Sequence, residues 1–424
     1  MHAVLTPVGS SGDINPFVIV GRELHRRGHR VTLIAPAVFG DTIANAGLEF
    51  VGVGTAEDYE RVTNDPALWH PRLGPRLVFR ELALQLRPAY AAIDSVYRPG
   101  ETVLVGHSLS LSTRVFEEHR SAPAVTIHLS PGVFRSDFEQ AALPSGLDIS
   151  GWPRWTKRTL WWVIDRVGVD PLIAPALNAW RAELGLPPVR RVLRSWFHSP
   201  QRVIGLFPGW FAQPQRDWPP QTRLTGFALS DDSCSPVDRR EFGDALDAFL
   251  AAGDAPIVFT PGSANRFAAE FLQAGIDAAD RIGRRALLVT KYRDHVPATL
   301  PPHAFHTPYA PFVSLFPRAA AVVHHGGIGT CAQGLAAGVP QLIMPMGFDQ
   351  PDNAARLARL GVGEALPPAR FTADRVAAAL SRLLSDAHVR ASAERWQGTQ
   401  RRSDALAQTC DLIEHVATRR EGNR

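Results

Sequence analysis

The stretch VVHHGGIGTCAQGL, residues 322–335, holds the residues with the clearest chemistry in the chain. Gly326, Gly327 and Gly329 follow an apolar run and precede an apolar helical pattern, so backbone amides and a helix N-terminus can meet an anion there at short range. Thr330 adds a hydroxyl, and an imidazole beside the turn adds a further donor. The pattern favours a phosphate site, although paired histidines also end buried strands for purely structural reasons.

Two other loops carry polar groups after apolar runs. Asp349 and Gln350 place a carboxylate beside an amide, which together can bond several hydroxyl groups of a buried ligand. Asp13 lies on the loop after the first apolar run. Its carboxylate can serve as a general base, or it can simply cap the helix that follows.

The elements that must position these loops follow from the hydrophobic periodicity. Val4–Pro7 reads as a strand, about Pro16–Arg27 as a helix and residues 28–36 as a second strand, which together form a βαβ unit. The same alternation returns near Ala255 and predicts a second doubly wound domain. Two such sheets facing each other would bring their C-terminal strand ends to one cleft, where open α/β sheets bind ligands.

Composition narrows the class of protein. The 424 residues carry 45 basic and 41 acidic side chains, a net charge of +4, without a Lys/Arg run, so a nucleic-acid partner is not expected. The three cysteines, Cys234, Cys331 and Cys410, have no paired spacing and predict neither a disulfide framework nor a thiolate metal site. No stretch is apolar enough for a signal peptide or a membrane span, so we expect a cytoplasmic protein.

Two alternatives for the chemistry come from other motifs. VLVGHSLS, residues 103–110, is similar to a nucleophile elbow, with Ser108 between strand and helix, but Ser110 replaces the last glycine. A hydrolase would also leave the histidine-glycine stretch unexplained. A metal site is the other alternative, yet its candidate histidines lack helical spacing or a carboxylate pattern: His303, His306, His324 and His325.

HHGGIGT followed by GVPQLIMPMGFDQPDNA resembles the donor-binding signature of the family-1, UDP-glycosyltransferase-like enzymes of the GT-B fold. The resemblance implies two facing Rossmann-like domains with the active site in the cleft between them, and transfer of a sugar from a nucleotide diphosphate without a metal or cofactor. It implies diphosphate contacts from His325, Gly327 and Thr330, and sugar contacts from Asp349 and Gln350. His324 would then have no ligand role.

Shorter matches extend the resemblance. Ser263 and Gly12 would contact the diphosphate, and Tyr309 in PYAPF would stack on the nucleobase. Gln333 stands where many relatives have a ribose-binding Glu. Asp13 takes the place of the catalytic base, which is a histidine in most relatives and an aspartate in a bacterial subgroup.

The resemblance also divides the chain. It implies an acceptor-binding domain over residues 1–228, a linker over 229–252, a donor-binding domain over 253–400 and a C-terminal helix over 401–424 that packs back on the first domain.

Finer features, including RSWFHSPQ and NDPALWHP, resemble the rhamnosyltransferases of bacterial rhamnolipid synthesis. This implies transfer of L-rhamnose from dTDP-L-rhamnose to a 3-(3-hydroxyalkanoyloxy)alkanoate. The resemblance leaves open whether the protein has a partner that synthesises the acceptor and whether it associates peripherally with the inner membrane. Trp162, His107 and Ser108 are the acceptor-pocket candidates. A polyphenol acceptor, and a non-catalytic subunit that binds sugar nucleotides, are the alternatives.

Overall fold

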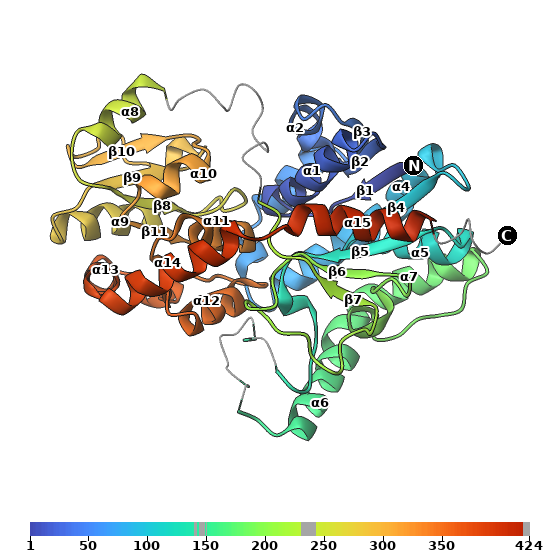
Figure 1. The fold of residues 1–424 in the computed structure, drawn as a ribbon. Helices are drawn as coiled ribbons and strands as arrows, with labels where there is room; N and C mark the ends of the chain where they lie inside the picture. Colours follow the sequence, from blue (N-terminus) through green and yellow to red (C-terminus); the bar gives the residue numbers. More distant parts are fainter. Residues whose placement is uncertain (140–141, 144–148, 150, 230–242, 419–424) are drawn as a thin grey trace. The chain divides into compact units, whose positions relative to one another are not determined.

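The computed structural model describes residues 1–139, 142–143, 149, 151–229 and 243–418, which form two compact units (Figure 1). Unit 1 holds the described residues of Met1–Leu143, Leu147–Ser233 and Asp404–Arg424, and unit 2 holds those of Cys234–Ser403.

Unit 1 is built on a parallel sheet, which has seven strands among the described residues, in the order β3-β2-β1-β4-β5-β6-β7. Every residue of β1, β4 and β5 is buried, which explains their continuous apolar sequence. The strands are β1 (His2–Thr6), β2 (Arg30–Pro36), β3 (Glu49–Val53), β4 (Thr102–His107), β5 (Ala124–His128), β6 (Val203–Gly205) and β7 (Thr222–Leu224).

The helices of unit 1 cover this sheet, and the first of them begins earlier than the sequence suggests. Helix α1 starts at Ser11 rather than near Pro16, because Ser10 and Asp13 form a capping box that fixes the first turn. Pro16 lies inside the helix, where it forgoes one backbone hydrogen bond. The helices are α1 (Ser11–Arg26), α2 (Gly40–Asn45), α3 (Ala56–Thr63), α4 (Leu73–Val96), α5 (Leu111–Arg120), α6 (Arg154–Val163), α7 (Asp170–Glu183) and α15 (Ala405–Thr418).

Unit 2 has a parallel sheet with the order β10-β9-β8-β11-β12-β13, six strands among the described residues. Separate apolar clusters around Phe259 and Phe316 pack helices against it. The strands are β8 (Ile257–Thr260), β9 (Ala286–Val289), β10 (Ala304–Thr307), β11 (Ala321–His324), β12 (Gln341–Ile343) and β13 (Gly363–Ala365). The helices are α8 (Asp244–Ala251), α9 (Ala269–Arg281), α10 (Phe312–Leu315), α11 (Ile328–Ala337), α12 (Gln350–Arg359), α13 (Ala373–Ser385) and α14 (Ala387–Arg401).

Each sheet reverses its strand order once. The switch lies between β1 and β4 in unit 1 and between β8 and β11 in unit 2. Loops that leave the carboxyl ends of such neighbouring strands diverge and leave room for a ligand. The expectation of two doubly wound parallel sheets is therefore confirmed, and each sheet has one switch point to examine.

The chain segments at the boundaries add two details. Helix α15 packs in unit 1, where Arg27 bonds Asp411 at 2.6 Å and Glu414 at 3.2 Å. Residues 230–242 of the predicted linker lie outside the described residues, whereas α8, at the end of that predicted linker, packs Leu246 and Leu250 into the core of unit 2.

Candidate active site

Asp13 lies in the first turn of α1, shortly after the end of β1. Its Oδ2 accepts hydrogen bonds from the Ser10 backbone N–H at 2.8 Å and from the Ser10 hydroxyl at 3.2 Å. Gly9, with φ of 133°, makes room for the carboxylate, because a Cβ there would lie 2.2 Å from Oδ2. The capping and catalytic interpretations of Asp13 are therefore compatible. Oδ2 bonds Ser10 in the capping box, and Oδ1 lies 3.9 Å from His107 Nε2.

The environment of Asp13 alters its protonation. Desolvation raises the pKa of Asp13 from 3.8 to about 6, against the lowering effect of the two Ser10 hydrogen bonds. The side chain keeps 36% of its surface accessible, so it can be reached from outside. A carboxylate with a pKa near 6 accepts a proton from an alcohol more readily than an ordinary aspartate does.

His107 ends β4 on the other side of the switch point and lies next to Asp13. Its Nε2 is 3.9 Å from Asp13 Oδ1, and its Nδ1 accepts the Leu109 backbone N–H at 3.4 Å. Because Nδ1 accepts, the proton of the neutral ring is on Nε2 and faces the carboxylate. Desolvation lowers the pKa of His107 to about 4, so the ring is neutral near pH 7.

Ser108 is hydrogen-bonded to a buried pair of histidines, His128 and His198. Its Oγ lies 2.7 Å from His128 Nδ1, and His128 Nε2 lies 2.8 Å from His198 Nδ1. Burial lowers the pKa of His128 well below its usual value and that of His198 to about 4. The bond from His128 leads to a second histidine, whereas a hydrolase triad has a carboxylate at that place. Sequence analysis missed His128 and His198, although a histidine ends β5 just as His107 ends β4.

His324, the first of the paired histidines, organises the glycine turn in unit 2. It is fully buried, its Nδ1 accepts the Gly326 backbone N–H at 3.1 Å, and its Nε2 lies 3.0 Å from Gln341 Oε1. Burial lowers the pKa of His324 to about 3, which keeps the ring neutral. Both ring nitrogens are engaged by the protein, as the structural role predicted for it requires.

His325 is held differently. Its ring lies between two glycines: a Cβ on Gly262 would come within 2.6 Å of Cε1, and one on Gly327 within 2.5 Å of Nε2. Among the described residues, the buried Nδ1 has no hydrogen-bond partner. Desolvation lowers the pKa of His325 to about 4, so the free ring is neutral rather than cationic at pH 7. A positioned ring with a polar atom left over is suited to a ligand that brings its own hydrogen-bonding group.

The N-terminus of α11 opens beside this ring. Gly327 is its N-cap and has no side chain to bond the first amides of the helix. Thr330 lies half-buried in the first turn, and Gln333 lies half-buried one turn further. Unsatisfied amides and the positive end of the helix dipole both favour an anion at this place.

Two further candidates follow other strands of the same sheet. Ser263, after β8, is exposed, and its carbonyl accepts the Tyr292 hydroxyl at 3.0 Å. Tyr309, after β10, has 56% of its surface exposed, and its carbonyl accepts the Thr307 hydroxyl at 2.8 Å. Both loops leave the carboxyl edge of the sheet, on the two sides of β9.

Asp349 and Gln350 lie at the start of α12, after β12. Gln350 Oε1 accepts the backbone N–H groups of Met346 at 2.8 Å and Gly347 at 3.3 Å. Asn353 Nδ2 donates to Asp349 Oδ2 and to the Gly326 carbonyl, both at 2.9 Å. Asn353 thus links this loop to the glycine turn. The sequence analysis expected Gln350 to contact the donor sugar, whereas in the structure its Oε1 accepts hydrogen bonds from the protein backbone.

Two domain families match separate parts of the chain. Residues 3–125 match the glycosyltransferase family 28 N-terminal domain, and residues 286–412 match the erythromycin biosynthesis protein CIII-like C-terminal domain. O-mycaminosyltylonolide 6-deoxyallosyltransferase of Streptomyces fradiae is 32% identical over 441 residues, which cover 99% of this chain and 98% of that protein. The chain belongs to the GT-B glycosyltransferases.

Solved structures show the same fold for this glycosyltransferase. The kitacinnamycin glycosyltransferase has a TM-score of 0.75 at 22% identity, with 98% of this chain and 99% of that chain covered. The spinosyn rhamnosyltransferase SpnG complexed with thymidine diphosphate has a TM-score of 0.68 at 19% identity, with 98% and 100% covered.

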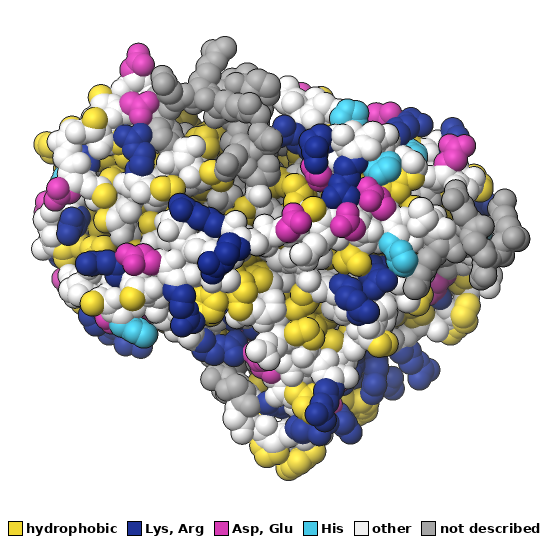
Figure 2. Space-filling model, in the orientation of Figure 1, with side chains coloured by type: hydrophobic (Ala, Val, Ile, Leu, Met, Phe, Trp, Pro, Cys, Tyr) yellow, Lys and Arg dark blue, Asp and Glu magenta, His cyan; other side chains and the backbone are white. Residues whose placement is uncertain are grey.

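The remaining candidates of the glycosyltransferase lie in unit 1. Gly12 is exposed in the first turn of α1, whereas the other diphosphate candidates belong to unit 2. Trp162 on α6 is 51% exposed and Trp155 is 70% exposed, whereas Trp161 and Trp180 are buried. Hydrophobic and basic side chains gather over α6 (Figure 2). The tryptophans of this segment are therefore divided between the surface and the core.

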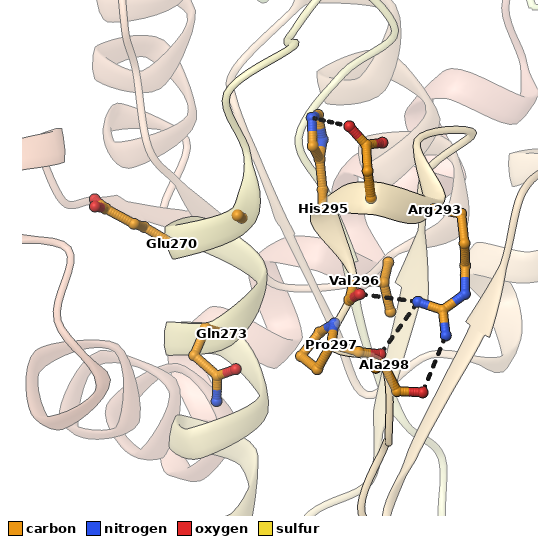
Figure 3. A pocket seen from close by; sticks show the side chains of 9 residues that line it. Glu270, Gln273, Arg293, His295, Val296, Pro297 and Ala298 are labelled. Carbon is orange, nitrogen blue, oxygen red and sulfur yellow. Dashed lines mark hydrogen bonds and ion pairs between the residues drawn. The ribbon is translucent and has the colours of Figure 1, made fainter.

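A hollow of about 830 Å³ in unit 2 of the glycosyltransferase contains none of the predicted residues. It lies between the start of α9 and residues 293–298, where Arg293 bonds the carbonyls of Val296, Pro297 and Ala298 (Figure 3). The cavity therefore has no part in the candidate site.

Two of the histidines considered for the alternative metal site lie against backbone carbonyls. His306 Nε2 lies 2.8 Å from the Thr290 carbonyl, and His303 Nε2 lies 3.3 Å from the Ile276 carbonyl. The described residues contain no group of three or more possible metal ligands. No helix in the described part of the chain has the length and apolarity to span a membrane.

Proposed function

We propose that this glycosyltransferase moves L-rhamnose from dTDP-L-rhamnose to a hydroxyl group of an apolar acceptor. The acceptor that we propose is a 3-(3-hydroxyalkanoyloxy)alkanoate. The observation that carries the donor half is His325, whose ring is pressed between Gly262 and Gly327 and whose Nδ1 is buried without a partner among the described residues. A diphosphate oxygen supplies the missing partner, and the open N-terminus of α11 bonds the same group.

The contribution of unit 2 is to bind the leaving group. Thr330 and Ser263 add hydroxyls toward the diphosphate, Tyr309 stacks on the nucleobase and Gln333 bonds the ribose. Because His325 is neutral in the free protein, it donates one N–H, and the developing charge of the diphosphate raises its pKa as the bond breaks.

The contribution of unit 1 is to remove a proton. As the acceptor oxygen forms its bond to the anomeric carbon, its proton passes to Asp13, and the bond from the anomeric carbon to the diphosphate oxygen breaks with its electron pair on the diphosphate. The products are dTDP and a glycoside of inverted configuration. A carboxylate whose acid has a pKa of about 6 is still far weaker as a base than an alkoxide, so proton transfer is late in this step.

The choice of sugar and nucleotide has support from the names of two relatives. The Streptomyces fradiae relative is named as a 6-deoxyallosyltransferase, and the SpnG rhamnosyltransferase was crystallised with thymidine diphosphate. Rhamnose is likewise a 6-deoxy sugar. The exposed Trp155 and Trp162 offer an apolar surface for an acceptor with a hydrocarbon portion, and they are compatible with peripheral membrane association in the cytoplasm.

The test is a matrix of donors and acceptors. The purified chain is incubated with dTDP-rhamnose, dTDP-glucose or UDP-glucose and with a lipid, a macrolactone or a flavonoid alcohol, and products are identified by mass. We expect rhamnosylated lipid as the main product. A main product from another pair would correct the sugar or the acceptor, and no product from any pair would refute the proposed transfer.

A further inference from the structure

The loop after β8 is held in place beside His325. A Cβ on Gly262, whose φ is 93°, would come within 2.6 Å of the His325 ring, so the backbone lies directly against it. The buried Asn265 donates its backbone N–H to the Gly262 carbonyl at 3.4 Å, and its Oδ1 accepts the Phe267 backbone N–H at 2.9 Å. Arg266 therefore has a fixed neighbour on each side of it in the chain.

The side chain of Arg266 is positioned by an aromatic ring but lacks a hydrogen-bond partner. Its Cζ lies 4.4 Å from the centre of the Tyr292 ring, and the Tyr292 hydroxyl donates to the Ser263 carbonyl at 3.0 Å. A ring face stabilises a cation but supplies no hydrogen-bond acceptor atom. The Nε of Arg266 is buried without a partner among the described residues, and Arg266 forms no ion pair with any of them.

The residues that we assign to the diphosphate carry no full positive charge. The pKa of His325 is lowered to about 4, so its ring is neutral at pH 7. Ser263, Thr330 and the first amides of α11 contribute only partial charges. A diphosphate ester is an anion, and its transfer out of water is costly without a counter-charge. Arg266, on the same loop as Ser263, has such a charge that is not used inside the protein.

We propose that Arg266 binds the diphosphate of the nucleotide-sugar donor; this rests on the proposed function. A guanidinium can use its Nε–H together with one terminal N–H to bond two oxygens of one phosphate group side by side. The unpartnered Nε of Arg266 is suited to this contact. Tyr292 restrains the guanidinium before the ligand arrives, which reduces the conformational entropy lost on binding. The charge also stabilises the diphosphate as its bond to the anomeric carbon breaks.

The test compares ligands with and without phosphate, with affinities for dTDP, UDP and thymidine measured by direct or competition calorimetry. We expect Arg266→Gln to lower dTDP affinity by roughly 10- to 100-fold, because hydrogen bonds to a charged group are lost. UDP affinity should fall in parallel, because UDP has the same diphosphate, whereas thymidine affinity should not change. Arg266→Lys keeps the charge without the planar fork and should restore part of the dTDP affinity.

Lys291→Gln is the matched control, because it removes a second cation from the same ring. Lys291 is exposed, and its Nζ lies 5.1 Å from the centre of the Tyr292 ring. Loss of this exposed charge should lower dTDP affinity by at most about 5-fold. Equal losses in Arg266→Gln and Lys291→Gln would overturn the proposal, as would unchanged dTDP affinity in Arg266→Gln. A parallel loss of thymidine affinity would overturn it too, because it would place Arg266 at the nucleoside or in the support of the loop.

The same measurements separate this proposal from the proposed function. If the wild type binds UDP and not dTDP, and Arg266→Gln weakens UDP binding, the choice of nucleotide fails and the role of Arg266 stands. If the affinities change as expected while no sugar is transferred to any acceptor, the proposed transfer fails and the role of Arg266 again stands. Binding of neither nucleotide diphosphate by the wild type would overturn the donor site and Arg266 together.

Discussion

The two switch points share one topology and use it for different chemistry. In unit 1 the first turn of α1 and the end of β4 bring together two titratable side chains, Asp13 and His107, whose Oδ1 and Nε2 are 3.9 Å apart. In unit 2 the loops after β8 and β11 bring two glycines against one histidine, His325, and open a helix N-terminus beside it.

Desolvation acts in opposite directions on the acid and on the histidines. It raises the pKa of Asp13 to about 6 and lowers those of His107 and His325 to about 4. In each case the uncharged form is favoured. Unit 1 therefore holds a carboxylate prepared to take up a proton, and unit 2 holds a neutral donor prepared to meet a charge that the ligand brings. We propose that the two units, built on one topology, differ in their chemistry through their loops: one supplies a base and the other binds an anion.

The largest expected effect is on the proton acceptor of unit 1. Asp13→Asn keeps an oxygen to accept the Ser10 N–H, so the start of α1 is preserved, but it removes the base. We expect kcat to fall by roughly 10²–10⁴-fold with unchanged dTDP affinity. Steady-state kinetics and calorimetry check both, with Asp41→Asn on the exposed start of α2 as the matched control. Turnover near that of the wild type would remove Asp13 from the mechanism.

The next effect is on the anion site of unit 2. His325→Ala removes the imidazole donor, and dTDP affinity should fall by about 10- to 100-fold, in line with about 1.5–3 kcal/mol for a hydrogen bond to a charged group. His303→Ala is the control, because His303 lies in the same unit and is bonded elsewhere. Equal dTDP affinity in both variants would show that the glycine turn binds diphosphate without His325, or that it does not bind it at all.

The loops that carry the candidate residues could be predicted from the sequence, but the contacts that fix those residues could not. The glycine loops and the parallel strands could be predicted from local patterns of residue types, whereas the different roles proposed for His324 and His325 came from the family resemblance. Local pattern could not show that Gly262, on the loop after β8, presses on His325, nor that Ser108 joins His128 and His198. These are contacts between strands that only the sheet order brings together. Helix α1 begins earlier than predicted because its N-cap is Ser10, and Asp13 is the third residue of the helix in the same capping box.

A third prediction sharpens the role of unit 1 through pH. Asp13 must be ionised to accept a proton, so kcat/KM should fall as the pH drops through about 6, the pKa of this carboxyl in the free protein. His107→Phe removes the Nε2–H that faces Oδ1, which should raise the pKa of Asp13 and move the acid limb to higher pH. His107→Gln, which keeps an N–H, should move it less. Superimposable profiles for all three proteins would mean that His107 does not orient the base.

The smallest expected effect is on stability and again concerns Asp13. The folded-state pKa of about 6 lies above the ordinary value of 3.8, so between these values the folded protein binds more protons than the unfolded chain. Stability is therefore lost as the pH rises from about 4 to about 6, and the ionised carboxylate is a cost above that range. Asp13→Asn should raise the melting temperature relative to the wild type at pH 7.5 and have little effect at pH 4, as measured by calorimetry. A variant that is less stable at pH 7.5 would mean that the capping bonds of the carboxylate outweigh its desolvation. A gain in stability joined to the loss of turnover would instead identify Asp13 as a group retained for chemistry at the expense of the fold.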